Sequence, residues 1–167
     1  MMSVIIRYAQ EGDLPRLADI YNYHVEHGHS TFQTEFTTID RLLDGFNQSS
    51  QVGPYQMLVA ECDGKVVGRA SSFQYRESEV FDKTVETGIY LDHTVMGKGV
   101  GSLLYEALFD TLSKEDLHLA VVGIALPNKG SVALHKKFGF REIGIFDEYA
   151  FVNGKYYSSI WMQKKIR

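Results

Sequence analysis

The stretch Leu91-Asp92-His93-Thr94-Val95-Met96-Gly97-Lys98-Gly99-Val100-Gly101-Ser102 decides the fold, because it joins an apolar strand to an amphipathic helix. Its three glycines alternate, and glycine adopts positive φ without steric cost. Such a loop turns several backbone N–H groups toward one point. The helix that starts directly after it adds unpaired N–H groups and the positive end of its dipole. The stretch therefore predicts a site for a phosphate or diphosphate group.

Two other phosphate-binding motifs fit this loop poorly. The Gly-x-x-x-x-Gly-Lys-[Ser/Thr] spacing of a P-loop is absent. A dinucleotide-binding loop follows the first strand, with Gly-x-Gly-x-x-Gly spacing and an acidic residue about 20 positions later. Here the third glycine comes one residue early and the loop follows a fourth strand. A turn that only starts a helix remains the structural alternative.

Hydrophobic periodicity outside the loop predicts alternating strands and helices. Asp13 is expected to cap a first helix, and Thr37-Thr38-Ile39-Asp40 resembles a capping box for a second. Asp63-Gly64 and Asn153-Gly154 are typical of tight hairpin turns. The expected order is β-α-α-β-β-β-α-β-α-β-β, an α/β fold with a mixed sheet. The strands are expected at 4–9, 55–62, 65–75, 84–91, 119–126, 140–145 and 155–164, and the helices at 14–27, about 39–46, about 102–112 and 131–138.

Composition and length narrow the function classes. The 167 residues contain no linker or repeat, which indicates a single domain over 1–167. A net charge of −4 argues against general binding to nucleic acid or an anionic membrane. No apolar run is long enough to span a bilayer, and the N-terminus lacks a signal-peptide pattern. Cys62 is the only cysteine, so we expect a cytoplasmic protein without disulfides.

Met96-Gly97-Lys98-Gly99-Val100-Gly101 resembles the [Arg/Gln]-x-x-Gly-x-[Gly/Ala] motif of the GNAT superfamily of N-acetyltransferases, with Met96 in place of the Arg or Gln. Several further segments, in the same order along the chain, resemble the phosphinothricin acetyltransferase branch of that superfamily. They are Ile6-Arg7-Tyr8-Ala9 with Asp13-Leu14-Pro15, Ser30-Thr31-Phe32, Thr84-Val85-Glu86 with Ile89-Tyr90-Leu91, and Ala125-x-x-Asn128-x-x-Ser131 with Leu134-His135-x-Lys137-Phe138-Gly139-Phe140.

The resemblance implies the GNAT fold, a mixed and mostly antiparallel sheet of about seven strands flanked by about four helices. It also implies acetyl-CoA as the cofactor and transfer of its acetyl group to the primary amine of a small amino-acid-like acceptor of the phosphinothricin or methionine sulfoximine type. Members of the branch form homodimers, so we expect a homodimer. A partner nucleic acid or membrane is not expected.

Glu86 is the candidate general base, because an amine with a pKa near ~10 must lose a proton before it attacks a thioester. Strand alternation puts residues 86, 88 and 90 on one face, and the resemblance places the branch's proposed base at Glu86. The alternative is that Glu86 only pairs with Arg69 or Arg76. His135 is the second catalytic candidate, as a proton donor to the departing thiolate or an aid to the amine. Its alternative is a packed histidine bonded to backbone.

The remaining site residues also come from the resemblance. An Arg binds a carboxylate through two parallel hydrogen bonds, which suits Arg76 to an amino-acid acceptor. Phe32 and Phe73 would wall the acceptor pocket beside Thr31, and Tyr149 would either close it or pack. The cofactor-binding candidates are Ile89, Tyr90, Leu91, Met96, Gly97, Lys98, Gly99, Val100, Gly101, Ser102, Asn128, Ser131 and Lys137.

Two alternative functions and a metal site fit the sequence less well. A module that senses acyl-CoA without turnover would lack a base, which Glu86 argues against. An enzyme that acetylates a protein N-terminus or a lysine would need an open site, which the aromatic residues argue against. His24, His27 and His29 lie close in sequence, but no acidic or cysteine ligand joins them, so no metal site is expected.

Overall fold

The structure is a computed structural model and describes residues 3–167. Seven strands form one sheet in the order β1-β2-β3-β4-β5-β7-β6, in which only β4 and β5 are parallel. This confirms the expected α/β architecture and its order of elements. No helix among residues 3–167 has the length and apolar character needed to cross a membrane. The strands are β1 (Val4–Tyr8), β2 (Met57–Cys62), β3 (Lys65–Gln74), β4 (Thr84–Leu91), β5 (Leu119–Ala125), β6 (Arg141–Val152) and β7 (Lys155–Lys165), and the helices are α1 (Leu14–His27), α2 (Ile39–Gln48), α3 (Val100–Leu112) and α4 (Lys129–Lys137).

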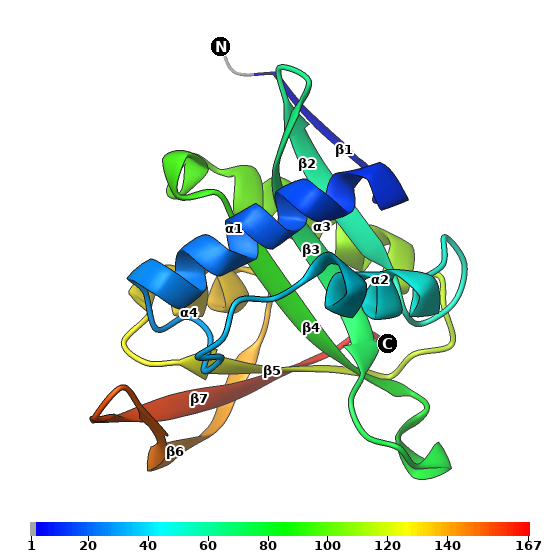
Figure 1. The fold of residues 1–167 in the computed structure, drawn as a ribbon. Coiled ribbons are helices and arrows are strands. Elements are labelled where there is room, and N and C mark those ends of the chain that lie inside the picture. Colours follow the sequence, from blue (N-terminus) through cyan, green and yellow to red (C-terminus); the bar gives the residue numbers. More distant parts are fainter. Residues whose placement is uncertain (1–2) are drawn as a thin grey trace.

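Helices cover both faces of the sheet, with α1 and α2 in front and α3 behind (Figure 1). The larger core lies between the sheet and α3, where Leu104, Tyr105 and Leu108 are fully buried. A smaller core, which contains Leu14 and Val59, lies under α1 and α2. The buried apolar residues of β2 and β3 divide between these two cores, so both faces of these strands are covered.

Both expected hairpin turns are confirmed. Asp63 and Gly64 have φ values of 50° and 78° between β2 and β3, and Asn153 and Gly154 have 50° and 80° between β6 and β7. Positive φ at both central residues defines a type I′ turn, whose twist matches that of the flanking strands.

Three local expectations were wrong. Asp13 precedes α1 without capping it, because its carboxylate accepts hydrogen bonds from Arg7 and from the Gln10 N–H. The cap of α2 is Thr38, whose hydroxyl accepts from the Arg41 N–H, so the cap lies one residue after the expected one and Arg41 replaces the acidic member of the expected box. Strand β6 runs to Val152 rather than ending at 145.

A fork between β4 and β5 sets up the functional site. The two strands pair only from Thr84 to Glu86 on β4, opposite Leu119 to Val121 on β5. Beyond Glu86, β4 stays paired with β3 while β5 stays paired with β7, and the two strands diverge (Figure 1). The edge of β4 that faces β5 is therefore open from residue 87 to residue 91.

Candidate active site

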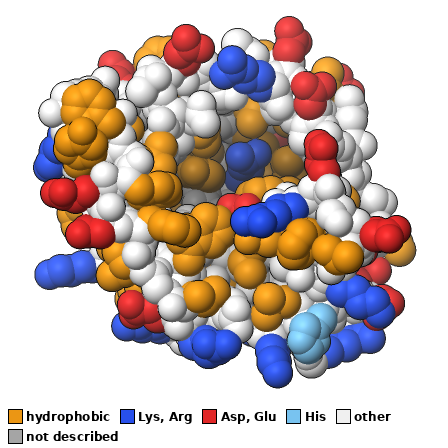
Figure 2. Space-filling model, turned by 90° about the horizontal axis from the view of Figure 1, so that it is seen from below, with side chains coloured by type: hydrophobic (Ala, Val, Ile, Leu, Met, Phe, Trp, Pro, Cys, Tyr) orange, Lys and Arg blue, Asp and Glu red, His pale blue; other side chains and the backbone are white. Residues whose placement is uncertain are grey.

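A cavity of about 700 Å³ occupies the fork between β4 and β5. Its walls come from β3, β4, β5, α1, the glycine-rich loop and α4. Viewed from below, the molecule is hollowed, with hydrophobic side chains on the walls of the hollow and a basic side chain inside it (Figure 2). The lining is largely apolar with a few polar groups, which is typical of a small-molecule site.

The glycine-rich loop forms the expected backbone nest. Gly97 and Gly99 have φ values of 73° and 87°, and a Cβ built on either glycine would meet nothing within 4 Å. Within residues 3–167, the N–H groups of Gly97, Gly99, Val100 and Gly101 donate to no protein group. Four unpaired donors with open space before them suit the diphosphate of coenzyme A.

Three other residues of the loop, Lys98, Val100 and Ser102, differ from the glycines in their backbone bonding or in their place relative to the cavity. The N–H of Lys98 donates to Val95 and that of Ser102 donates to Gly99, so neither backbone donor is free for a ligand. Neither Lys98 nor Val100 lines the cavity through its side chain. Val100 is buried against the larger core instead.

Helix α4 brings a cation to the nest. The Nζ atom of Lys137 donates to the Ser102 hydroxyl over 2.9 Å, at the first turn of α3. Asn128 caps α4, because its Oδ1 atom accepts from the Ser131 N–H over 3.1 Å. All four residues line the cavity, so this wall offers both backbone donors and a positive charge to an anionic ligand.

Glu86 lies at the vertex of the fork. It is the last β4 residue paired with β5, and on its other side it pairs with Phe73 of β3. Among residues 3–167 its carboxylate forms no ion pair and no hydrogen bond, so it pairs with neither Arg69 nor Arg76. Burial raises the pKa of Glu86 above its ordinary value. A carboxylate with a raised pKa in a cavity suits a general base.

His135 lines the same cavity from α4 but is almost completely buried, with 1% of its surface exposed. Its Nδ1 atom lies 2.7 Å from the Ser131 carbonyl oxygen, which can only accept, so Nδ1 carries a proton. The Nε2 atom lies 2.8 Å from the Tyr105 hydroxyl. Burial lowers the pKa of His135, which favours the neutral ring that accepts the Tyr105 proton at Nε2.

The expected acceptor residues are only partly brought together. Phe73 lines the cavity, whereas Thr31, Phe32 and Arg76 do not. Thr31 lies behind the wall, where its hydroxyl is 2.7 Å from that of Tyr21. Phe32 packs against Tyr149, with ring centroids 5.8 Å apart, so Tyr149 packs outside the cavity.

Arg76, expected to bind the acceptor carboxylate, is not among the residues that line this cavity. The central guanidinium carbon of Arg76 lies 5.0 Å from the Tyr75 ring centroid and 5.7 Å from that of Phe81, on the connection between β3 and β4. In the structure these cation–π contacts place its side chain beside that connection.

Sequence reasoning missed several residues of the cavity, and Arg69 is the most notable. Arg69 lies on β3 opposite Tyr90, and Ser71 follows two positions later on the same face. Tyr21 adds a wall from α1. The sequence did contain a signal for Arg69, because it is the one charged residue in the otherwise uncharged run from Val66 to Phe73.

The clustered histidines bind backbone instead of a common ligand. The ring nitrogens of His24, His27 and His29 lie 2.7, 3.2 and 2.6 Å from the carbonyl oxygens of Leu91, Tyr23 and Pro127. In the part of the chain that the structure describes, no three metal-ligating side chains come together.

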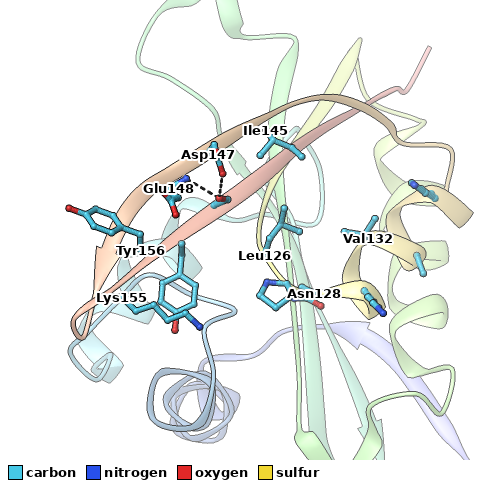
Figure 3. Close-up of a pocket in the computed structure, with 14 residues that line it drawn as sticks. Leu126, Asn128, Val132, Ile145, Asp147, Glu148, Lys155 and Tyr156 are labelled. Carbon is cyan, nitrogen blue, oxygen red and sulfur yellow. Dashed lines mark hydrogen bonds between the residues drawn. The ribbon is translucent and has the colours of Figure 1, made fainter.

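A second cavity of about 730 Å³ lies between α4 and the β6–β7 hairpin (Figure 3). Val132 lines it from α4 and Ile145 from β6. On the hairpin side, the Ser158 hydroxyl donates to Asp147 and accepts from the Glu148 N–H. This second cavity contains neither the nest nor Glu86, so the cavity in the fork is the candidate active site.

Comparisons with known proteins agree with this geometry. The family model described as "Acetyltransferase (GNAT) domain" matches residues 6–161. The chain is 38% identical to a phosphinothricin N-acetyltransferase of Streptomyces coelicolor, over 98% of this chain and 96% of that protein. It is 33% identical to an L-methionine sulfoximine/L-methionine sulfone acetyltransferase of Pseudomonas aeruginosa, over 97% of this chain and 94% of that protein.

A solved structure extends the likeness to a bound cofactor. The structure of yncA from Salmonella typhimurium with its cofactor acetyl-CoA superposes with a TM-score of 0.91 and 29% identity, over 98% of this chain and 94% of that one. Its fold is the one described above. The nest, the fork and the matches along the chain lead to one assignment: the chain belongs to the GNAT family of acetyltransferases, is an N-acetyltransferase with phosphinothricin acetyltransferases among its relatives, and uses acetyl-CoA as its cofactor.

Proposed function

We propose that this enzyme acetylates the primary amine of a small amino-acid-like acceptor of the phosphinothricin or methionine sulfoximine type, with Glu86 as the general base. The observation that carries the proposal is the position of the Glu86 carboxylate, unpaired within residues 3–167, at the vertex of the fork that ends beside the nest. The names of the two relatives support the acceptor class.

The cofactor supplies an acetyl thioester, which a neutral amine can attack. The free N–H groups of the nest and the Lys137 ammonium would hold the diphosphate. The open edge of β4 from Ile89 to Leu91 would pair with the pantetheine arm, in the manner of an added strand. Bound between these points, the thioester would lie toward the vertex, where Glu86 is located.

Glu86 would take the proton that the acceptor ammonium loses, directly or through a water. Its raised pKa brings the carboxylate closer to the working pH, which improves proton transfer. Phe73 gives the cavity an apolar wall, and the cavity volume of about 700 Å³ suits a small acceptor beside the cofactor arm. A protein N-terminus or lysine fits such a site less well.

The leaving thiolate needs a proton, and the ring of His135 is the candidate that the sequence suggested. We propose that water supplies this proton instead, because Nδ1–H of His135 is bound to the Ser131 carbonyl and Nε2 accepts from Tyr105. We therefore predict that His135→Gln lowers kcat by less than about tenfold. A loss of 10²–10⁴-fold, about the range of general acid catalysis, would restore His135 to the acid role. Steady-state rates with a thermal unfolding control measure the difference.

The acceptor class is tested by release of free CoA thiol from acetyl-CoA. We expect turnover with phosphinothricin or methionine sulfoximine, and little with polyamines, peptides that carry free N-termini, or lysine peptides. Preference for the peptides would replace the proposed acceptor class. Binding of acetyl-CoA without turnover across the whole panel would instead indicate a sensor of acyl-CoA.

We further infer that residues 1–167 act as one acetyltransferase domain and that the chain forms a homodimer. One sheet takes strands from Val4 to Lys165, which supports the first inference. The second is supported by β6, an edge strand whose large apolar side chains are exposed, including Phe146 at 56% and Phe151 at 63%. Light scattering at micromolar concentration should give twice the chain mass, and a monomer would contradict the inference.

A further inference from the structure

Arg69 is a positive charge in the wall of the cavity without a counter-ion. It projects from β3 opposite Tyr90 and lines the cavity. Its central guanidinium carbon lies 5.8 Å from the Tyr90 ring centroid. Its guanidinium forms no hydrogen bond or ion pair with any group within residues 3–167.

The surroundings of Arg69 leave its charge uncompensated. Burial lowers the pKa of Arg69, yet a guanidinium stays protonated in proteins. The pKa of Tyr90 is raised to about 12, so its hydroxyl is neutral at physiological pH. Glu86 is the one carboxylate among the cavity-lining residues, and it forms no ion pair with Arg69. A partly buried charge is costly unless it meets an anion, and this one faces the cavity.

The register separates Arg69 from the base. Arg69 on β3 pairs with Tyr90 on β4, and Phe73 on β3 pairs with Glu86 on β4. Arg69 is therefore offset from Glu86 by four residues along the paired strands. Four strand residues span about 13 Å, and both side chains point to the same face. An acceptor with its amine at Glu86 would thus present its far end to Arg69.

We propose that Arg69 binds an oxyanion, a carboxylate or a phosphinate, at the end of the acceptor farthest from the reacting amine. This inference rests on the acetyltransferase function proposed above and names a feature of its substrate. The guanidinium would donate two parallel hydrogen bonds to the oxyanion, which fixes both position and orientation. Arg69 thereby selects acceptors with a charged distal end over those with a neutral one.

The phosphates of the cofactor are a different source of negative charge, and they have their own cation. Lys137 lies beside the nest, bonded to Ser102 on α3. Arg69 projects from β3 toward the wall that Tyr21 and Tyr90 form. The two cations therefore line different walls of the cavity, Arg69 beside Tyr90 and Tyr21 and Lys137 beside α3.

Two acceptors with the same α-amino acid head test the proposal. Phosphinothricin ends in a phosphinate, whereas methionine sulfoximine ends in an uncharged group. We expect Arg69→Met to lower kcat/KM for phosphinothricin by about 30-fold or more, mainly through KM, because a buried charged contact loses its partner. The same variant should leave methionine sulfoximine within about threefold and the KM for acetyl-CoA unchanged. Arg69→Lys should recover part of the loss.

Arg41→Met is the matched control, because Arg41 lies exposed on α2 and does not line the cavity. It should leave both acceptors unaffected. An equal loss for both acceptors in Arg69→Met, or no loss for either, would overturn the proposal while the acetyltransferase function stands.

Binding of phosphinothricin to the complex of the enzyme with CoA, measured by calorimetry, separates this proposal from the proposed function. If the wild type turns over neither acceptor, the acceptor class given under the proposed function is wrong. Arg69-dependent binding of phosphinothricin, weakened about 30-fold in Arg69→Met, would still support the oxyanion site. Equal affinity in the two proteins would overturn it.

Discussion

Glu86→Gln should lower kcat by about 10²–10⁴-fold while the affinity for acetyl-CoA stays at the wild-type value. Glutamine keeps the shape of the side chain but cannot accept the amine proton, and the residue is remote from the nest that would hold the diphosphate. The deficit should shrink as pH rises, because each unit toward the amine pKa of ~10 increases the fraction of neutral acceptor about tenfold. Rates of thiol release between pH 6 and about 9.5 give both results, within the range that the assay tolerates.

The same substitution should stabilise the fold at neutral pH. Burial raises the pKa of Glu86, so the folded state binds this proton more tightly than the unfolded state does. The free energy of unfolding therefore falls as pH rises from the ordinary value of 4.5 through the raised pKa, and the cost persists above it. Thermal unfolding at pH 7 should show a higher midpoint for Glu86→Gln, with the difference gone at a pH below about 4.

Glu106→Gln is the control for both effects, because Glu106 is exposed on α3. It should match the wild type in rate and in stability. An unchanged kcat for Glu86→Gln, or a parallel loss of acetyl-CoA affinity, would remove Glu86 from the role of base. A lower unfolding midpoint at neutral pH would contradict the unpaired, buried environment of its carboxylate.

Local sequence signals predicted most of the fold correctly because the decisive interactions there are local. The pairs Asp63-Gly64 and Asn153-Gly154 require positive φ and specify their turns. The glycines from Gly97 to Gly101 specify the nest for the same reason. The sequence also named Glu86, and Glu86 lines the cavity in the structure.

The failures involve contacts between distant segments or a break in periodicity. Asp13 has the position of a cap, but Arg7 on β1 competes for its carboxylate. The pairing of β6 with β7 slips between Phe146 and Ala150, and Glu148 takes a φ of 46°, so no alternation marks the second half of β6. A bulge of this kind hides a strand from pattern reasoning.

The acceptor end of the site shows the same limit. Arg76 and Arg69 are both arginines near Phe73 in sequence, but Arg76 lies against Tyr75 and Phe81, outside the residues that line the cavity. The register of β3 against β4 turns Arg69 inward. The sequence could therefore predict that a guanidinium would bind an anion of the acceptor, but it could not predict which arginine lines the cavity.

Gly99→Val should abolish measurable binding of acetyl-CoA, with a loss of at least about 100-fold. Gly99 has a φ of 87°, where a β-branched residue is strained by roughly 1–2 kcal/mol. If the backbone keeps this conformation, the new side chain projects into the open space before the nest. If φ turns negative, the neighbouring N–H groups rotate away from the diphosphate. Either response removes charge-assisted hydrogen bonds that contribute about 1.5–3 kcal/mol each.

Gly64→Val separates backbone strain from loss of the ligand site. Gly64 has a φ of 78° in the turn between β2 and β3, and its Cβ would also meet nothing within 4 Å. Both variants should lose similar stability, because the strain is of the same kind. Calorimetry with CoA should show wild-type affinity for Gly64→Val and none for Gly99→Val. Wild-type affinity in Gly99→Val would mean that the diphosphate binds elsewhere, because both backbone responses described above disturb the nest.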